Sequence, residues 1–248
     1  MSPKGMSRRF QSTLGLPCIV SIAAGEFFAV AMDKSGGLWS WASCGRGFID
    51  GQLGDRPTFL PHHPRRVSGL PAIHQFACGP TSTVAEASDG TLWTFGKQLG
   101  HRTWQIDSGQ YRTEHCGAIK LSSAPPGPLR YLGAGESYVL AIDANRCIWT
   151  AGQHAFGVLG RENQSSEFQP VLGLSGVLQA SAGWNHVLAR EEDGRMWCWG
   201  FMGHKYPECQ VALPKRLPEL DLVHSFMRKR ILSHHTGTWS HRTNPAQR

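Results

Sequence analysis

ASAGWNHVLAREEDGRMWCWG, from Ala180 to Gly200, is the stretch of sequence that decides the fold. Two short apolar runs flank the turn pair Asp193-Gly194, in which glycine adopts a positive φ at little steric cost. The stretch therefore predicts a β-hairpin with a two-residue turn. Small residues open the stretch, as expected for an inner strand that crowds toward a central axis. Trp197 supplies a large apolar side chain that can pack against a neighbouring unit.

The same pattern occurs three more times along the chain. Its glycine marker and its tryptophan marker recur at the same intervals, 54, 56 and 48 residues. A repeat of this length, built from strands and turns, is typical of the blades of a β-propeller. The composition agrees, because 29 glycines and 9 tryptophans in 248 residues favour an all-β chain with many turns. The markers are Gly25, Gly79, Gly135 and Gly183, with Trp39, Trp93, Trp149 and Trp197.

A second turn motif follows the tryptophan in three of the units. It is complete as Gly51-Gln52-Leu53-Gly54, is repeated at 157–160 and leaves a remnant at 98–100. The whole pattern is Ala-Gly, an apolar strand, Asp-Gly, Leu-Trp-x-Trp-Gly and then Gly-Gln-Leu-Gly. It resembles the repeat of the regulator-of-chromosome-condensation family over about residues 17–226. The resemblance implies an all-β propeller of four-stranded blades, a fold that serves many functions.

The chain is short for this family, whose complete members have seven blades. We expect four blades, near 17–66, 67–125, 126–170 and 171–218, and a partial strand of a fifth at 219–226. Disordered basic tails are expected at 1–16 and 227–248, and the segment 97–125 of the second blade is expected to protrude as a loop. Four blades could form an open arc, a small closed ring, a self-associated assembly or a truncated gene product, because an open arc leaves sheet faces and edges exposed.

The loops that follow the marker glycines are the candidate binding site. In the nucleotide exchange factor that names the family, acidic and histidine residues of such loops contact a small GTPase. The resemblance places Glu26 and Glu136 in the acidic position and His186 in the histidine position, with Trp184 and Asn185 beside it. A purely structural role for His186, bonded to an adjacent loop, is the alternative. The sequence thus predicts a protein-binding scaffold, with regulation of a small GTPase by nucleotide exchange as the specific hypothesis.

The charge distribution argues against nucleic-acid binding by the folded region. The formal net charge is +7, of which +3 lies in residues 1–17 and +3 in residues 219–248. The central region therefore carries only +1, whereas a nucleic-acid-binding domain usually carries its positive charge on its folded face. The alternative that remains is a chromatin-associated or nucleic-acid-associated module that uses the basic tails.

The sequence predicts no enzyme, cofactor or metal site. No nucleophile motif or phosphate-binding loop occurs, and His234, His235 and His241 lie in the expected tail without a cysteine pair to complete a zinc site. A metal-dependent catalytic propeller is kept as the lesser alternative. The seven cysteines are odd in number and include no C-x-x-C, and Cys78, Cys147 and Cys198 lie in apolar runs, so buried free thiols are expected.

The compartment is only weakly indicated. Reduced thiols favour an intracellular protein, cytoplasmic or nuclear. The acid-free segment 1–16, with its Arg8-Arg9 pair, resembles a mitochondrial processing stretch, and the basic run at 228–230 is short for a nuclear signal. No apolar stretch reaches the length that a membrane-spanning helix needs.

Overall fold

The computed structural model of the chain describes residues 15–42, 51–54, 63–96, 105–107, 110–112, 117–153, 156–162, 167–201 and 211–218. The predicted fifth strand at 219–226, the tail at 227–248 and nearly all of the tail at 1–16 lie outside these residues. No helix in the described ranges is long and apolar enough to cross a membrane.

Four four-stranded antiparallel sheets make up most of the described part of the chain, which confirms the predicted all-β fold of four-stranded blades. Blade 1 contains β1 (Ile19–Ala24), β2 (Phe28–Asp33), β3 (Leu38–Ala42) and β4 (Arg65–Arg66). Blade 2 contains β5 (Ile73–Cys78), β6 (Ser82–Ala87), β7 (Leu92–Gly96) and β10 (Ile119–Lys120). Blade 3 contains β11 (Leu129–Ala134), β12 (Tyr138–Asp143), β13 (Ile148–Gly152) and β14 (Gln169–Pro170). Blade 4 contains β15 (Val177–Ala182), β16 (His186–Glu191), β17 (Met196–Gly200) and β18 (Val211–Arg216).

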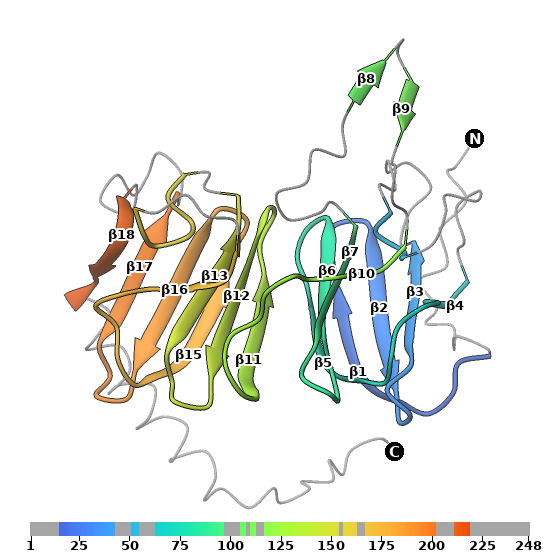
Figure 1. Cartoon of the computed structure of the whole chain (residues 1–248), viewed down its shortest axis with the longest axis horizontal. Coiled ribbons are helices and arrows are strands. Elements are labelled where there is room, and N and C mark those ends of the chain that lie inside the picture. The colour runs from blue at the N-terminus through green and yellow to red at the C-terminus, as the bar shows by residue number, and fades with distance from the viewer. Residues whose placement is uncertain are drawn as a thin grey trace, which may run out of the picture.

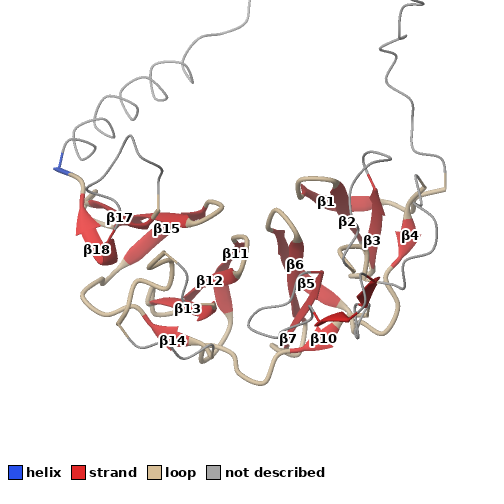
Figure 2. Cartoon of the chain, turned by 90° about the horizontal axis from the view of Figure 1, so that it is seen from above, coloured by secondary structure: helices blue, strands red, loops and turns tan. Residues whose placement is uncertain are grey.

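The blades stand side by side in chain order and form an open arc (Figure 2). Within each blade the strands follow one another in sequence, except that the hairpin of β8 (Gln105–Asp107) and β9 (Gln110–Arg112) is inserted between β7 and β10. Figure 1 shows this hairpin standing away from the four blades. The predicted loop at 97–125 thus contains a strand pair of its own and also the outermost strand of blade 2.

The hairpin between the second and third strands has the same geometry in all four blades. In blade 1 the Asp33 amide donates to the Gly37 carbonyl at 3.0 Å, and the Gly36 amide donates to the Asp33 carbonyl at 3.0 Å. Three residues therefore lie between the closing pair, and the third of them has a positive φ, 79° at Gly36. The prediction of two-residue turns is wrong, because the left-handed residue follows a complete turn instead of forming its centre. In blade 3 the left-handed position is held by Arg146, with φ 63°.

An acidic residue at the end of the second strand holds the marker tryptophan. The Nε1 atoms of Trp39, Trp149 and Trp197 each donate to a carboxylate six residues earlier, at 2.8 to 2.9 Å; the acceptors are Asp33, Asp143 and Glu191. Blade 2 has alanine at this position, and the Trp93 indole bonds to the Thr91 hydroxyl instead, at 3.0 Å. A buried indole N–H needs a partner, so this acid fixes the tryptophan in place.

The hydrophobic cores lie between blades and not inside them. One core joins blades 1 and 2, the next blades 2 and 3, and the last blades 3 and 4. Trp93, Trp149 and Trp197 each pack against the core shared with the preceding blade, as the sequence predicted for the tryptophan strand. Every residue of β6 and β12 in the middle blades is buried, whereas burial alternates along β16 in blade 4.

The expectation of buried thiols holds only in part. Cys198 is buried and Cys78 is partly buried, and burial raises the pKa of the Cys78 thiol to about 12. Cys147 is exposed, which corrects the prediction for this residue. It ends the hairpin turn before β13 and gives its amide to the Asp143 carboxylate, so its side chain lies outside the strand pattern.

Candidate functional site

Antiparallel order places two loops of every blade on the same edge of the arc. These are the loops between the first and second strands and between the third and fourth strands, and we call this side the loop edge. The hairpins between the second and third strands, and the connections to the next blade, lie on the opposite side, the hairpin edge. All the candidate binding residues from the sequence lie on the loop edge.

Two of the marker glycines, Gly25 and Gly135, are required by an aromatic ring of their own loop. A Cβ atom on Gly25 would lie 1.9 Å from the Phe28 ring, and one on Gly135 would lie 1.8 Å from the Tyr138 ring. The side chain three positions on therefore occupies the space next to each glycine. At these two glycines the nearest atoms belong to the same loop. At Gly79, in contrast, a Cβ atom would lie 2.2 Å from the Gly135 carbonyl oxygen of blade 3, so the neighbouring blade limits the space there.

His186 occupies the same position as the two aromatic rings. A Cβ atom on Gly183 would lie 2.3 Å from its Nε2 atom, and His186 itself is half-buried. The imidazole thus fills the space over its own loop glycine, a packing role that Phe28 and Tyr138 serve in blades 1 and 3. Contact between His186 and a partner stays a prediction.

The loops of blades 3 and 4 are joined directly through Glu136 and Trp184. The Trp184 indole Nε1 donates to the Glu136 carboxylate, and the Glu136 amide donates to the Trp184 carbonyl at 3.0 Å. Trp184 remains 47% exposed. The two predicted residues therefore form one contact, in which the carboxylate orients an exposed aromatic ring.

Glu26 lies on the loop edge but away from this contact. Its amide donates to the Pro80 carbonyl of blade 2 at 2.9 Å, and its side chain is exposed. One blade, blade 2, lies between it and Glu136. The structure thus gathers Glu136, Trp184, Asn185 and His186 at one end of the loop edge and leaves Glu26 at the other.

The hydroxyl of Tyr138 in blade 3 forms hydrogen bonds with the blade 4 loop. Its oxygen lies 2.9 Å from the Gly183 carbonyl oxygen and 2.6 Å from the His186 carbonyl oxygen. Burial, and to a smaller extent the neighbouring Tyr131, hold the pKa of Tyr138 far above its ordinary value, so the hydroxyl keeps its proton as a donor. The Asn185 carbonyl in turn accepts the Phe201 amide at 2.6 Å. The loop that carries Trp184 is therefore fixed on both sides.

Two aromatic residues of the loop edge were missed by the sequence analysis. Phe156 and Phe201 lie in the loops between the third and fourth strands of blades 3 and 4, and their ring centroids are 5.4 Å apart. Phe156 is 61% exposed and has a φ of 55°, a left-handed conformation that is uncommon for a bulky residue. Its signal in the sequence is its place directly before the second turn motif at 157–160.

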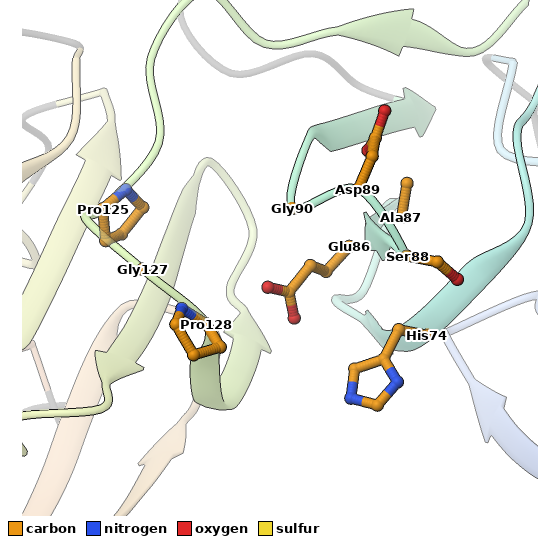
Figure 3. Close-up of a pocket in the computed structure, with 9 residues that line it drawn as sticks. All are labelled: His74, Glu86, Ala87, Ser88, Asp89, Gly90, Pro125, Gly127 and Pro128. Carbon is orange, nitrogen blue, oxygen red and sulfur yellow. The ribbon is translucent and has the colours of Figure 1, made fainter.

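A pocket of about 550 Å³ opens on the hairpin edge, between blades 2 and 3 (Figure 3). Glu86 is its most buried polar group, at 3% exposure, and its carboxylate accepts bonds from Gln75 Nε2 and from the Leu129 amide. Asp89, whose pKa is lowered chiefly by the Thr91 hydroxyl, lies at the rim. The bond from the Leu129 amide joins blade 2 to blade 3, so we assign the pocket's buried carboxylate a structural role.

Within the described ranges, no three histidine, cysteine, aspartate or glutamate side chains cluster so as to hold a metal ion. The histidines that the sequence raised as zinc ligands, at 234, 235 and 241, lie outside those ranges. The chemistry that the loop edge offers is therefore that of a surface: exposed aromatic rings, carboxylates and an amide side chain, on loops fixed by hydrogen bonds.

Comparison with known proteins gives consistent matches. Residues 177–204 match the family model of the regulator of chromosome condensation (RCC1) repeat. The ultraviolet-B receptor UVR8 of Arabidopsis thaliana is 28% identical over 192 residues, which are 73% of this chain and 41% of the relative. Protein RCC1 of Candida albicans is 24% identical over 220 residues, covering 81% of this chain and 44% of the relative. The chain thus spans less than half the length of these two curated relatives.

Solved structures of Prp20, the yeast RCC1, share the fold. The Saccharomyces cerevisiae protein, described with its binding properties to Gsp1p and histones, superposes with a TM-score of 0.64 at 21% identity, over 80% of this chain and 50% of that one. The same yeast protein has also been solved bound to Kap60, with a TM-score of 0.64 over 80% of this chain and 49% of that chain.

Four consecutive four-stranded blades, with their cores between neighbours and fixed loops along one edge, define a β-propeller repeat protein. The family match falls on blade 4, where the glycine and tryptophan markers and the hairpin between them are all present. Blade 4 matches the regulator of chromosome condensation (RCC1) repeat, and the four blades of the described residues share the fold of the yeast RCC1 structures.

Proposed function

We propose that the chain is a protein-binding scaffold, without catalytic activity, whose partner contacts the loop edge of blades 3 and 4. The observation that carries this proposal is the pair of exposed rings there, Trp184 at 47% and Phe156 at 61%. Aromatic residues that are exposed and held in one orientation are typical of the residues that dominate protein interfaces. Trp184 is oriented by the Glu136 carboxylate, and Phe156 by its left-handed backbone and the Phe201 ring.

The specific proposal is that the partner is a small GTPase, bound through acidic and aromatic groups. It is supported by the family resemblance, which places Glu26 and Glu136 in the acidic loop positions. The yeast relative described with its binding to Gsp1p and histones shows that a protein of this fold binds other proteins. Against a direct role of His186 stands its packing over Gly183, so we assign the contact to Glu136 and Trp184 first.

Binding of purified candidate GTPases to the full chain tests both proposals. We expect Trp184→Ala and Phe156→Ala each to weaken the affinity at least about tenfold, which is about 1.4 kcal/mol. Leu172→Ala is the matched control, because Leu172 is an apolar residue 78% exposed on the hairpin edge. Equal effects of the three substitutions would show that the loop edge is not the binding surface.

Release of a fluorescent guanine nucleotide from the same GTPases separates exchange from simple binding. An exchange factor accelerates release, and Glu136→Gln should reduce that acceleration. If the GTPase binds but its nucleotide is not released faster, the scaffold proposal stands and the exchange proposal is rejected.

A further inference from the structure

Each blade buries the same two positions against the blade that follows it. In blades 1 to 3 the third residue of the second strand and the first residue of the third strand are at most 1% exposed. These are Val30 and Leu38, Val84 and Leu92, and Leu140 and Ile148. In blade 4 the equivalent residues are Leu188 and Met196, and both are only half-buried. We call the surface around Leu188 and Met196 the trailing face.

At the opposite end of the arc, blade 1 exposes apolar residues that in the other blades face the preceding blade. The fourth residue of the first strand faces the preceding blade; in blade 3 it is Leu132, which is 6% exposed. In blade 1 the equivalent residue is Ile22, which is 76% exposed. Ile19, whose equivalents Ile73 and Val177 are 4% and 0% exposed, is also partly accessible. We call the surface around Ile19 and Ile22 the leading face.

Backbone hydrogen bonds align two of the three internal junctions on the hairpin edge, and at the junction of blades 2 and 3 the Leu129 amide donates to the Glu86 carboxylate instead. The Ile73 amide of blade 2 donates to the Gly36 carbonyl of blade 1 at 2.9 Å, and the Val177 amide of blade 4 donates to the Arg146 carbonyl of blade 3 at 3.0 Å. By the same register, the trailing face carries the Gly194 carbonyl, and the leading face carries the amide of Ile19. The two ends therefore hold the two halves of one junction.

The charges at the two ends are also complementary. At the internal junction of blades 3 and 4, an ion pair between Arg146 and Glu192 links the two hairpins. At the ends, the blade 4 hairpin carries Asp193, whose side chain is 51% exposed and forms an ion pair with Arg195 of the same hairpin at 2.6 Å. The blade 1 hairpin carries the exposed Lys34, which would reach Asp193 as a second base. An acid thus lies on the trailing face's hairpin, and a base lies on the leading face's hairpin.

We propose that the trailing face of blade 4 binds the leading face of blade 1 in a second copy of this chain, so that two chains close head to tail into a ring. Figure 2 shows blade 1 and blade 4 at the two ends of an open arc. The contact is heterologous, and a heterologous contact closes only when the rotation between the copies completes a circle. Two contacts in one closed particle reinforce each other, because the second forms within the complex. In the ring, Glu26 of one copy stands beside Trp184 of the other and extends the loop edge across the junction.

The mass of the full chain in solution, measured by sedimentation and light scattering, tests the proposal. We expect a particle of twice 27.3 kDa. Ile22→Arg and Leu188→Arg should each give a folded single chain, with folding checked by circular dichroism. An equal mixture of the two variants should form a two-chain particle again, because the intact trailing face of one meets the intact leading face of the other. Leu172→Arg, on neither end face, is the matched control and should keep the mass of the unmodified chain.

An independent pair of variants avoids any change in the apolar faces. Lys34→Glu should weaken the two-chain particle, and adding Asp193→Lys to the same chain should restore it. The proposal is overturned if the unmodified chain has a mass of 27.3 kDa at every concentration. It is equally overturned if masses grow beyond two chains, or if the arginine variants fail to recombine.

Discussion

The indole Nε1 of Trp149 donates a 2.9 Å hydrogen bond to Oδ2 of Asp143, while Oδ1 of the same carboxylate accepts the Asn145 and Cys147 amides at 2.9 Å each. Asp143 is 1% exposed, so its loss leaves buried donors without a partner. We predict that Asp143→Ala lowers the free energy of unfolding by about 3 kcal/mol, measured by urea denaturation. The control is Glu192→Gln, which removes an exposed ion pair and should change stability by less than about 1 kcal/mol. Equal losses in the two variants would contradict the role of the buried acid.

Asp33 should make the stability of the chain fall at acid pH. Bonds from the Ser35 hydroxyl and the Trp39 indole are the largest causes that hold the pKa of Asp33 well below its ordinary value. Because the pKa is depressed in the folded state, the stabilisation is present above the unfolded value of about 3.9 and is lost as the pH falls toward the folded value.

The measurement is the free energy of unfolding of the original chain and of Asp33→Asn between neutral pH and pH 3. The difference between the two should shrink as the pH falls below about 4, since protonation removes the same charge that the substitution removes. Glu162→Gln, at an exposed carboxylate, is the control. A difference that stays constant with pH would show that the charge of Asp33 contributes nothing.

Gly135→Ala should destabilise the chain through the Tyr138 ring. The new methyl group would lie 1.8 Å from that ring, and the backbone there is held by the bonds of the Gly135 amide to the Tyr138 carbonyl at 2.9 Å and of the Glu136 amide to the Trp184 carbonyl at 3.0 Å. We expect a loss of about 2 to 4 kcal/mol in thermal or urea unfolding. Gly117→Ala is the control, because a Cβ atom there meets nothing within 4 Å. If both substitutions have the same small effect, the Tyr138 ring is not the reason that position 135 requires glycine.

The thiols should differ widely in reactivity. Alkylation in the native state at mildly alkaline pH, followed by peptide mass mapping, should modify Cys147 and Cys18 before Cys78. The cause is that the thiolate is the reactive form, and the pKa of Cys78 is raised to about 12 by burial, so its thiolate is scarce at that pH. Modification of Cys78 as fast as Cys147 would mean that the strand pair opens readily. Unfolding in urea should abolish the difference.

The blades could be predicted from sequence because two markers keep one register, Gly183 with Trp197 and their equivalents. The turn type could not, because Asp-Gly pairs suit two different hairpins and only the hydrogen bonds tell them apart. The anchoring acids were visible six residues before each tryptophan, at Asp143 for example. They were overlooked because blade 2 breaks the pattern with Ala87 and uses Thr91 instead.

The sequence could predict which loops form the candidate site, but not which of their residues contact one another. Sequence placed Glu26 and Glu136 in equivalent positions, and only the arc shows that the whole of blade 2 lies between them. The contact of Glu136 with Trp184 joins residues 48 positions apart, and no local sequence pattern predicts it. Phe156 was missed because its exposure and left-handed backbone come from the fold of its loop, and phenylalanine more often indicates a core.

Placing every core between neighbouring blades has a consequence for how such a chain changes length over evolutionary time. An inserted or deleted stretch of one whole repeat leaves each surviving junction with the same kind of partner on both sides. A gain or loss of half a repeat instead removes the strand that covers a junction, so that the apolar residues of the junction become exposed to solvent. Modules of this design are therefore added and removed as intact units, and the number of repeats can drift while the junction chemistry stays constant.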